Sequence, residues 1–282
     1  MIFHNLNAEL FIPDNVLESV ALSRTTHMSI AAHPDDIEIM AYDGILKCYE
    51  NPDQWFSGVV ISNGSSSARD GLYKNYTDDQ MMDVRKKEQK KASIIGKYGS
   101  LFMLDYTSKE VKDSNDLVIV NEISEILRKT KPEIIYTHNL ADKHDTHIGV
   151  AIKTIKAVRT LSKQERPKHL FGCEVWRSLD WLLDSDKILF DVSKNPQLAI
   201  DLLTVYESQI VGGKRYDLAT LGRRVANATY TSSHTVDESQ AVIYAMDLTP
   251  LIEDDSLNIA SYVENYVENV KRDIINKIKK SL

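Results

Sequence analysis

The sequence of 282 residues is poor in cysteine: it has only Cys48 and Cys173, and they form no Cys-x-x-Cys motif. Two isolated cysteines cannot supply the disulfide framework that stabilises small secreted proteins. The N-terminus also lacks the basic stretch and apolar run that are typical of a secretory signal. We therefore expect a reducing, cytoplasmic location.

Long hydrophobic runs and an excess of positive charge are absent as well. No segment comes near the ~18–20 consecutive apolar residues of a membrane span. The 34 basic and 41 acidic residues give a net charge of −7, and the basic residues are dispersed. The sequence therefore predicts neither membrane insertion nor a nucleic-acid partner. With 43% hydrophobic and 27% charged residues, the chain has the composition of a globular protein with a substantial core.

Strand-like and helix-like segments alternate through the first two-thirds of the chain. This βαβα order predicts an α/β, Rossmann-like fold, in which a mainly parallel sheet is flanked by helices. Such sheets carry their chemistry in loops beyond the carboxyl ends of the strands. The expected strands are 27–32, 55–61, 100–104 and 133–138, and the expected helices are 36–49, 77–97, 117–129 and 148–161.

The remainder of the chain has a different pattern. It predicts a helix at 196–209, a strand at 240–248 and a long helix at 256–280, which together form a C-terminal α+β extension. No internal repeat or low-complexity linker divides the sequence. We therefore expect one domain over residues 1–282, with a Rossmann-like core at about 25–210 and the extension at about 211–282.

A first cluster of polar side chains follows the first predicted strand, in Ala32-His-Pro-Asp-Asp-Ile-Glu38. Aspartates at such a position often only cap the next helix. A histidine, two aspartates and a glutamate within six positions are more than a cap requires, and Pro34 stiffens the turn that carries them.

A second cluster follows the fourth predicted strand, in His138-Asn-Leu-Ala-Asp-Lys-His-Asp-Thr-His147, and contains three of the eight histidines. His144 and His147 lie three residues apart at a helix start, which places both rings on one side of the first turn. We expect both clusters at the same edge of the sheet, so they can converge on one ion. Two imidazoles and one carboxylate, with a water in the open position, form a catalytic zinc site.

The motif His-Pro-Asp-Asp-Ile-Glu with a distant His-x-x-His resembles the PIG-L/LmbE-like deacetylases over roughly residues 28–209. Weaker matches are Asn63-Gly64, Arg85-x-x-Glu88 and Tyr206-Glu-Ser-Gln209. The resemblance implies a zinc-dependent hydrolase that removes an N-acetyl group from an N-acetylated amino sugar or its conjugate. Its partner would then be a small-molecule amino-sugar substrate.

The resemblance also implies a role for each residue of the two main motifs. His33, Asp36 and His147 correspond to zinc ligands and Asp35 to the general base. His144 corresponds to the charged partner of the tetrahedral intermediate and to the general acid that protonates the leaving nitrogen. A zinc-bound water has a pKa of about 7, so a neighbouring carboxylate can take its proton at neutral pH. Zn²⁺ is the expected metal, and Fe²⁺ is also compatible, because sites of two histidines and one carboxylate accept both.

The sequence departs from the family pattern in two places. Only Gly44 remains of a glycine-rich stretch that usually follows the Asp-Asp-x-Glu motif. Thr146 stands where many members have an aspartate immediately before the ligand histidine. The orientation of the His144 ring would therefore depend on Asp142 or Asp145.

Three further residues are weaker candidates for substrate contacts. Arg69, after the Ser-rich loop, is either a solvated loop charge or a contact to a sugar hydroxyl or phosphate. His234 is either a surface histidine or a pocket residue, and Asn63 begins the loop that resembles the family. The loops expected to set specificity are 62–79, 176–186 and 212–233.

Two alternative functions stay open at this point. His33-Pro-Asp35 with a distant histidine also fits the facial triad of a non-haem Fe(II) oxygenase, although such sites normally lie in all-β barrels. A sugar-binding protein of the same fold that has lost catalysis is the other alternative.

An apolar stripe runs along the last predicted helix. Its spacing fits packing against the core, and a subunit interface is a second interpretation, which leaves a homo-oligomer open. The residues of the stripe are Tyr262, Val263, Tyr266, Val267, Val270 and Ile274.

Overall fold

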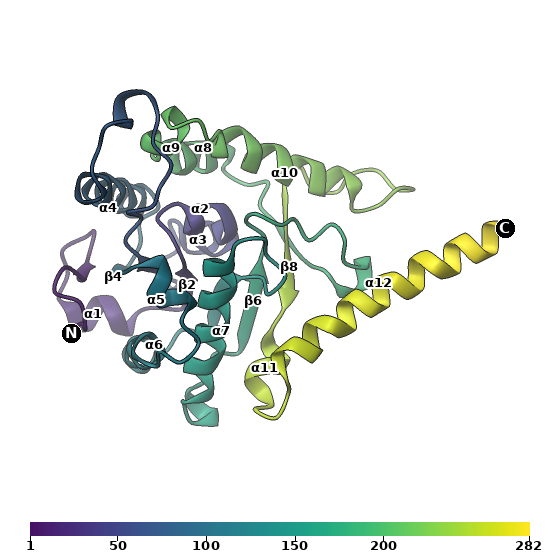
Figure 1. The fold of residues 1–282 in the computed structure, drawn as a ribbon, viewed down its shortest axis with the longest axis horizontal. Coiled ribbons are helices and arrows are strands. Elements are labelled where there is room, and N and C mark those ends of the chain that lie inside the picture. The colour runs from purple at the N-terminus through teal and green to yellow at the C-terminus, as the bar shows by residue number, and fades with distance from the viewer.

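The computed structural model describes residues 1–282 and has one eight-stranded sheet at its centre, with helices on both faces (Figure 1). The strands are β1 (Glu9–Phe11), β2 (His27–Ala31), β3 (Phe56–Ser62), β4 (Ser100–Tyr106), β5 (Ile134–His138), β6 (His169–Cys173), β7 (Ile188–Asp191) and β8 (Val242–Asp247). Their order in the sheet is β1-β4-β3-β2-β5-β6-β8-β7. The five strands from β4 to β6 run parallel, whereas β1, β8 and β7 pair antiparallel. The predicted α/β fold with a mainly parallel sheet is confirmed.

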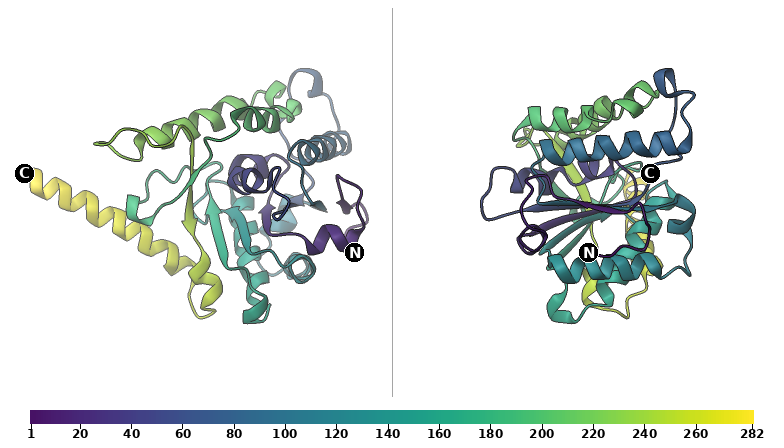
Figure 2. Two further views of the ribbon diagram at one scale, coloured as in Figure 1. Left: turned by 180° about the vertical axis from the view of Figure 1, so that it is seen from behind. Right: turned by 90° about the vertical axis from the view of Figure 1, so that its left-hand side faces the viewer.

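The helices cover the sheet in two layers, which Figure 2 shows edge-on. One layer contains α2 (Asp36–Met40), α3 (Tyr42–Cys48), α4 (Asp78–Ile95), α8 (Pro196–Thr204), α9 (Glu207–Val211) and α10 (Tyr216–Tyr230). The other contains α1 (Glu18–Ser23), α5 (Ser108–Lys112), α6 (Val118–Thr130), α7 (Asp145–Arg159) and α11 (Thr249–Glu253). None of the helices combines the length and apolarity that crossing a membrane requires.

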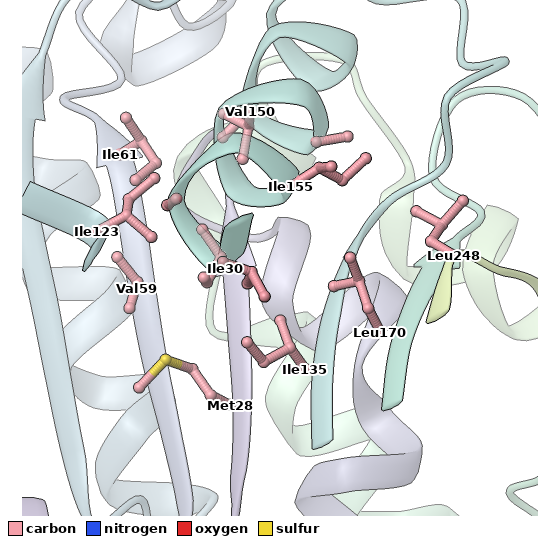
Figure 3. Close-up of a cluster of buried hydrophobic side chains, with 14 of the residues drawn as sticks. Met28, Ile30, Val59, Ile61, Ile123, Ile135, Val150, Ile155, Leu170 and Leu248 are labelled. Atoms are coloured by element: carbon pink, nitrogen blue, oxygen red, sulfur yellow. The ribbon is translucent and has the colours of Figure 1, made fainter. Parts of the chain in front are cut away.

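Alternate residues of the parallel strands face two separate hydrophobic clusters, because successive side chains of a strand point to opposite faces. Ile30 and Val59 belong to the cluster that packs against α6 and α7, which is drawn in Figure 3. Their chain neighbours Ala31 and Val60 belong to the cluster that packs against α2, α3 and α8. Burial on both faces explains why these strands read as continuous apolar runs in the sequence.

Three strands were not expected from the sequence. β1 and β7 have only three and four residues, and most of these are partly exposed, so they carry no apolar run. β6 is one residue longer than β7 and includes Gly172, which lacks a side chain to signal a strand.

Several helices differ from their predicted bounds. The helix expected at 36–49 is interrupted at Ala41, and the one expected at 196–209 divides into α8 and α9. α10 lies inside the segment 212–233 that was expected to be a loop. Its buried side includes the polar residues Asp217, Arg224 and Asn227, whereas Leu218 and Val225 are exposed. Leu218, Leu221, Val225 and Ala228 do recur at helical spacing, so the sequence held a helix signal that the expectation of a loop overlooked.

The C-terminal segment is joined to the same sheet. β8, from the expected C-terminal extension, lies between β6 and β7, which belong to the expected core. Strands from the two parts of the chain are therefore paired in one sheet. The last helix, α12 (Ile259–Ser281), contacts the core through Tyr262, Val263 and Tyr266. Its far end extends away from the body, and Ile274 and Ile278 there are about half exposed.

Gly44 is expected to be essential for the packing of α3 on the sheet. A Cβ at this position would lie 2.6 Å from the Tyr136 ring and 3.0 Å from the Phe56 ring, and both rings are buried. Gly44→Ala should therefore lower the free energy of unfolding by about 1–3 kcal/mol, as overpacking does. Denaturant unfolding measures the change.

Gly222→Ala is the matched control, because a Cβ there meets no atom within 4 Å. Within α10 it should leave stability unchanged or raise it by about 0.4–1 kcal/mol. Equal effects of the two substitutions would contradict the packing described for α3.

Candidate functional site

The two polar clusters meet where the winding of the sheet reverses. From β2 the chain continues to β3 and β4 on one side, whereas β5 and β6 lie on the other side. β2 and β5 are parallel neighbours, so the loops after both strands leave the same edge of the sheet. Open α/β sheets bind their ligands at this kind of switch point.

Three donor atoms converge here, from the loop after β2 and from the first turns of α2 and α7. His33 Nδ1 lies 3.1 Å from Asp36 Oδ2 and 3.2 Å from His147 Nε2, and the last two atoms are 3.3 Å apart. Ligand atoms about 2.0–2.2 Å from a tetrahedral zinc ion would lie about 3.3–3.5 Å from one another. The donor set and its spacing therefore fit one divalent ion, with the fourth position left for water or substrate.

A carboxylate behind His147 fixes the direction of its ring. His147 Nδ1 lies 3.4 Å from Asp142 Oδ2, which orients Nε2 toward His33 and Asp36. Asp142 also accepts hydrogen bonds from the backbone N–H groups of His144 and Trp176. This is the carboxylate–histidine arrangement that typically orients metal ligands.

His138 is part of the site although the sequence suggested no role for it. Its ring stacks on His147 with a centroid distance of 3.8 Å and is completely buried. The Ala32 N–H donates to His138 Nε2 at 2.9 Å, so this nitrogen is occupied and the proton is on Nδ1. His138 therefore supports the ring of His147 and holds the end of β2. The sequence feature that could have indicated this role is the position of His138 at the end of the predicted fourth strand, the edge where functional residues gather.

The adjacent residues Asp35 and Asp36 point in different directions because of the backbone at Asp35. Its φ of 96° is in the left-handed region, which is uncommon for residues other than glycine. Asp36 thereby faces His33 and His147, whereas Asp35 Oδ2 accepts a hydrogen bond from Arg85 Nη2 at 2.6 Å. Burial raises the pKa of Asp35 to about 6, although the Arg85 guanidinium opposes the rise.

The weak sequence matches come together around Arg85, which is almost completely buried. Its guanidinium donates to Asp35, to the Pro34 carbonyl and to Glu88. The Ser208 N–H and hydroxyl donate to the two oxygens of Glu88, at 2.7 and 2.8 Å. Gly64 lies against the stem of Arg85, where a Cβ would be 3.2 Å from its Cγ.

A second buried network supports the turn at Asp35. The Gln89 side chain accepts a hydrogen bond from the Asp35 N–H at 3.1 Å and donates to Glu38 at 3.0 Å. The hydroxyls of Tyr98 and Tyr206 also donate to Glu38, each at 2.6 Å. Burial raises the pKa of Glu38 to about 7.

His144 lies beside the three donors. The centre of its ring lies 4.9 Å from the centre of the His33 ring and 4.7 Å from the centre of the His147 ring. Neither expected aspartate orients it: the Asp142 side chain contacts the His147 ring and the backbone of His144, and Asp145 is exposed. Burial and the neighbouring His147 and His33 lower the pKa of His144 to about 4. These surroundings favour a neutral ring, whereas the expectation from the resemblance was a charged one.

A cavity of about 730 Å³ opens over the donors, which is a typical volume for a small-molecule site. His33, Asp35, Asp36 and His144 line it, together with residues of α10 and the loop before that helix.

The three weaker candidates do not line this cavity. Asn63 accepts a hydrogen bond from the Ser65 N–H within its own loop. Arg69 donates to the Ser65 carbonyl and pairs with Asp78. His234 is exposed in the loop after α10.

The fold and the donor set define an α/β protein with a group of side chains suited to hold a metal ion at the switch point of its sheet. Residues 28–158 match the model of the PIG-L family, described as GlcNAc-PI de-N-acetylase. An uncharacterized deacetylase of Escherichia coli K12, YaiS, is 25% identical over 157 residues, which cover 52% of this chain and 78% of that protein. These matches confirm the resemblance to the PIG-L/LmbE-like deacetylases, which the family model places in residues 28–158.

Solved structures support the fold. N,N'-diacetylchitobiose deacetylase from Pyrococcus horikoshii has a TM-score of 0.63 at 13% identity, over 86% of this chain and 90% of that one. GalB, the 4-carboxy-2-hydroxymuconate hydratase from Pseudomonas putida KT2440, has a TM-score of 0.61 at 16% identity, over 79% and 96%. Because one neighbour is a hydratase and the other a deacetylase, the fold alone does not determine the reaction.

Two neighbouring histidines could replace one member of this donor set. His144 is close enough to His33 and His147 to share an ion with them, and His138 is close enough to Asp36 and His147. His138 Nε2 already accepts the Ala32 N–H, however, and lies 3.5 Å from Asp36 Oδ2. The shorter distances favour Asp36 as the third ligand. His147→Ala should therefore lose most of its bound zinc, because it removes one of three converging donors. Metal analysis of the purified, desalted protein measures the loss.

His144→Ala is the matched comparison and should retain its zinc. If His144→Ala lost the metal and Asp36→Asn kept it, the donor set would be His33, His144 and His147 instead.

Proposed function

We propose that this protein is a metal-dependent hydrolase that removes the N-acetyl group from an N-acetylated amino sugar or its conjugate. The observation that carries the proposal is the triangle of His33, Asp36 and His147 donors, with the Asp35 carboxyl lining the same cavity. The match of residues 28–158 to the PIG-L family model supports the deacetylase class, and the cavity has room for a sugar-sized ligand.

His33, Asp36 and His147 would hold the ion, with Zn²⁺ the first candidate and Fe²⁺ the second. A bound zinc ion lowers the pKa of water to about 7 and polarises a carbonyl oxygen. Asp142 holds His147 through the contact with Nδ1, so His147 Nε2 faces His33 and Asp36 and would be available as a ligand.

Asp35 is proposed to accept the proton of the attacking water. Its carboxyl lines the cavity next to Asp36, and a pKa of about 6 lets it accept a proton near neutral pH and release it again. Arg85 holds the carboxyl in place through the 2.6 Å hydrogen bond. Asp35 can therefore return the proton to the amine that leaves.

His144 is proposed to contact the reacting amide from the other side. Its ring lies beside His33 and lines the cavity. A neutral imidazole has one N–H, and this group can donate to the carbonyl oxygen as negative charge develops on it. In this position His144 stabilises the tetrahedral intermediate without binding the ion.

The oxygenase alternative is not favoured. The oxygenase triad would need Asp35, which follows His33 in a His-x-Asp motif, to face the two histidines. The carboxylate beside His33 and His147 is Asp36 instead, and Asp35 pairs with Arg85. The sheet is also mainly parallel and flanked by helices, unlike the all-β barrels that normally carry that triad.

Release of acetate tests the proposed reaction. The zinc-loaded protein should produce acetate from at least one member of a panel of N-acetylated amino sugars. A chelator should abolish the release, and added zinc should restore it. A metal-loaded protein that binds these sugars but releases no acetate would be a binding protein instead, and turnover that requires dioxygen and an oxoacid would indicate the oxygenase.

Asp35→Asn should keep its zinc and lose about 10²–10⁴ in kcat, which is the usual contribution of a positioned general base. Asparagine tolerates the left-handed φ at this position, so the turn should be preserved. Metal analysis and steady-state kinetics on the same preparation measure both quantities.

Asp145→Asn changes an exposed carboxylate of the second cluster, outside the cavity lining, and is the control that should retain wild-type kcat. An Asp35→Asn enzyme with nearly full activity would remove Asp35 from the reaction.

A further inference from the structure

The second half of the last helix, α12, lies apart from the rest of the chain. Figures 1 and 2 show this half projecting beyond the body of the protein. The first half packs on the core through Tyr262, Val263 and Tyr266. The apolar side chains that follow are 44–51% exposed, and they are Val267, Ile274, Ile275 and Ile278.

These exposed side chains form a row along the helix. Spacings of four, seven and four residues place Val263, Val267, Ile274 and Ile278 on one side of α12, which we call its apolar side. The apolar side therefore runs from the contact with the core to the projecting half. Single exposed apolar residues are common on protein surfaces, but a contiguous row of them marks an interaction site.

A groove beside the first half of α12 offers a second apolar surface. It has a volume of about 740 Å³ and lies between α7 and residues 255–263. The apolar residues that line it are Leu140, Ile148, Ile152, Leu257, Ile259 and Val263. Because Val263 also belongs to the apolar side of α12, the groove opens on the same side of the helix as the exposed row.

The charge of the chain reverses between the groove and the projecting half. Residues 253–268 contain five acidic and no basic side chains, whereas residues 271–280 contain five basic and one acidic. The helix dipole favours cations only in the last turn, so it does not account for Lys271 and Arg272 in the middle of α12. The two halves are complementary in charge, and such complementarity selects the orientation of a partner more than it adds affinity.

We propose that two copies of this chain associate through α12 as an antiparallel pair. The apolar side of each projecting half lies in the groove of the other copy, so a two-fold axis covers both apolar surfaces in both copies. Val270 is the middle residue of α12, and an axis beside it places Ile274 and Ile278 of one copy near Ile259 and Val263 of the other. The basic half of each helix then lies along the acidic segment of its partner.

This interface goes beyond the proposed function and does not depend on it, since α12 lies outside residues 28–158 that match the family model. A basic amphipathic helix can also bind an anionic membrane surface. The second copy is favoured because a membrane would leave the groove uncovered. It would also bring Glu264 toward anionic headgroups, because Glu264 lies three turns before Ile275 on the same side of the helix.

Light scattering during size-exclusion chromatography tests the association. At micromolar concentrations the wild-type protein should have twice the mass of one chain. Ile274→Glu combined with Ile278→Glu should raise the dissociation constant by at least about 100-fold, because two charges would be buried in an apolar groove. Both side chains are about half exposed in the single chain, so the variant should stay folded, which circular dichroism checks.

Asn265→Glu combined with Asn276→Glu is the matched control. It changes the net charge equally, and both positions are exposed on the opposite side of α12. This variant should keep the mass of the dimer.

Charge reversal tests the antiparallel orientation. Lys279→Glu combined with Lys280→Glu should raise the dissociation constant by about 3–10-fold, and adding Glu264→Lys and Glu268→Lys should restore most of the loss. In a parallel pair like charges already face each other, so the first two substitutions would not weaken it.

A wild-type protein that stays monomeric at micromolar concentrations would overturn the proposal, as would a dimer that survives Ile274→Glu with Ile278→Glu. A monomer that sediments with vesicles of phosphatidylcholine and phosphatidylserine, and loses this binding in the same variant, would assign α12 to a membrane surface instead. A dimer in which the charge reversals neither weaken nor restore association would contradict the antiparallel arrangement.

Discussion

The site depends on the parallel pairing of β2 with β5 at the switch point of the sheet. This pairing directs the carboxyl ends of both strands to one edge, and it brings His33 Nδ1 to 3.2 Å from His147 Nε2 across 114 residues of sequence. Two imidazoles and a carboxylate so close together, in a largely buried position, present converging lone pairs that a divalent cation satisfies. The Ala32–His138 hydrogen bond ties the two strand ends directly, so the donors are set by the sheet rather than by flexible loops.

A buried arginine explains why adjacent aspartates can have different roles. Arg85 holds Asp35 and the Pro34 carbonyl, while Gln89 accepts the Asp35 N–H, and together they stabilise a left-handed backbone conformation that would otherwise be strained. Asp36 is thereby free to face the histidines. Breaking a buried pair of this kind typically costs about 3–5 kcal/mol, because one charge is left without a partner. The same guanidinium contacts Glu88, which links α4 to Ser208 in α9 and closes that side of the cavity.

The sequence was sufficient to predict the parallel core of the sheet, because strands that are buried on both faces produce apolar runs. The helices between these strands show apolar residues at helical spacing. The helix α10 was overlooked although Leu218, Leu221 and Val225 recur at helical spacing, because the segment was assigned to a specificity loop. The strands β1 and β7 are too short and too exposed to give an apolar run. The same limit applies to the site. The residues of the two motifs lie together at one edge of the sheet, but the role of His138 follows from a hydrogen bond with a backbone N–H, which no sequence pattern announces. The orientation of His144 also could not be deduced, since Asp142 turned out to contact His147.

The most direct test of the central claim is an anomalous difference map at the zinc absorption edge, from crystals of the zinc-loaded protein. The account predicts a single strong peak at the carboxyl ends of β2 and β5, about 2.0–2.2 Å from His33 Nδ1, Asp36 Oδ2 and His147 Nε2. His144 and His138 should lie outside bonding distance of that peak. A peak coordinated by His144 or His138 in place of Asp36, or no peak at this edge of the sheet, would contradict the account.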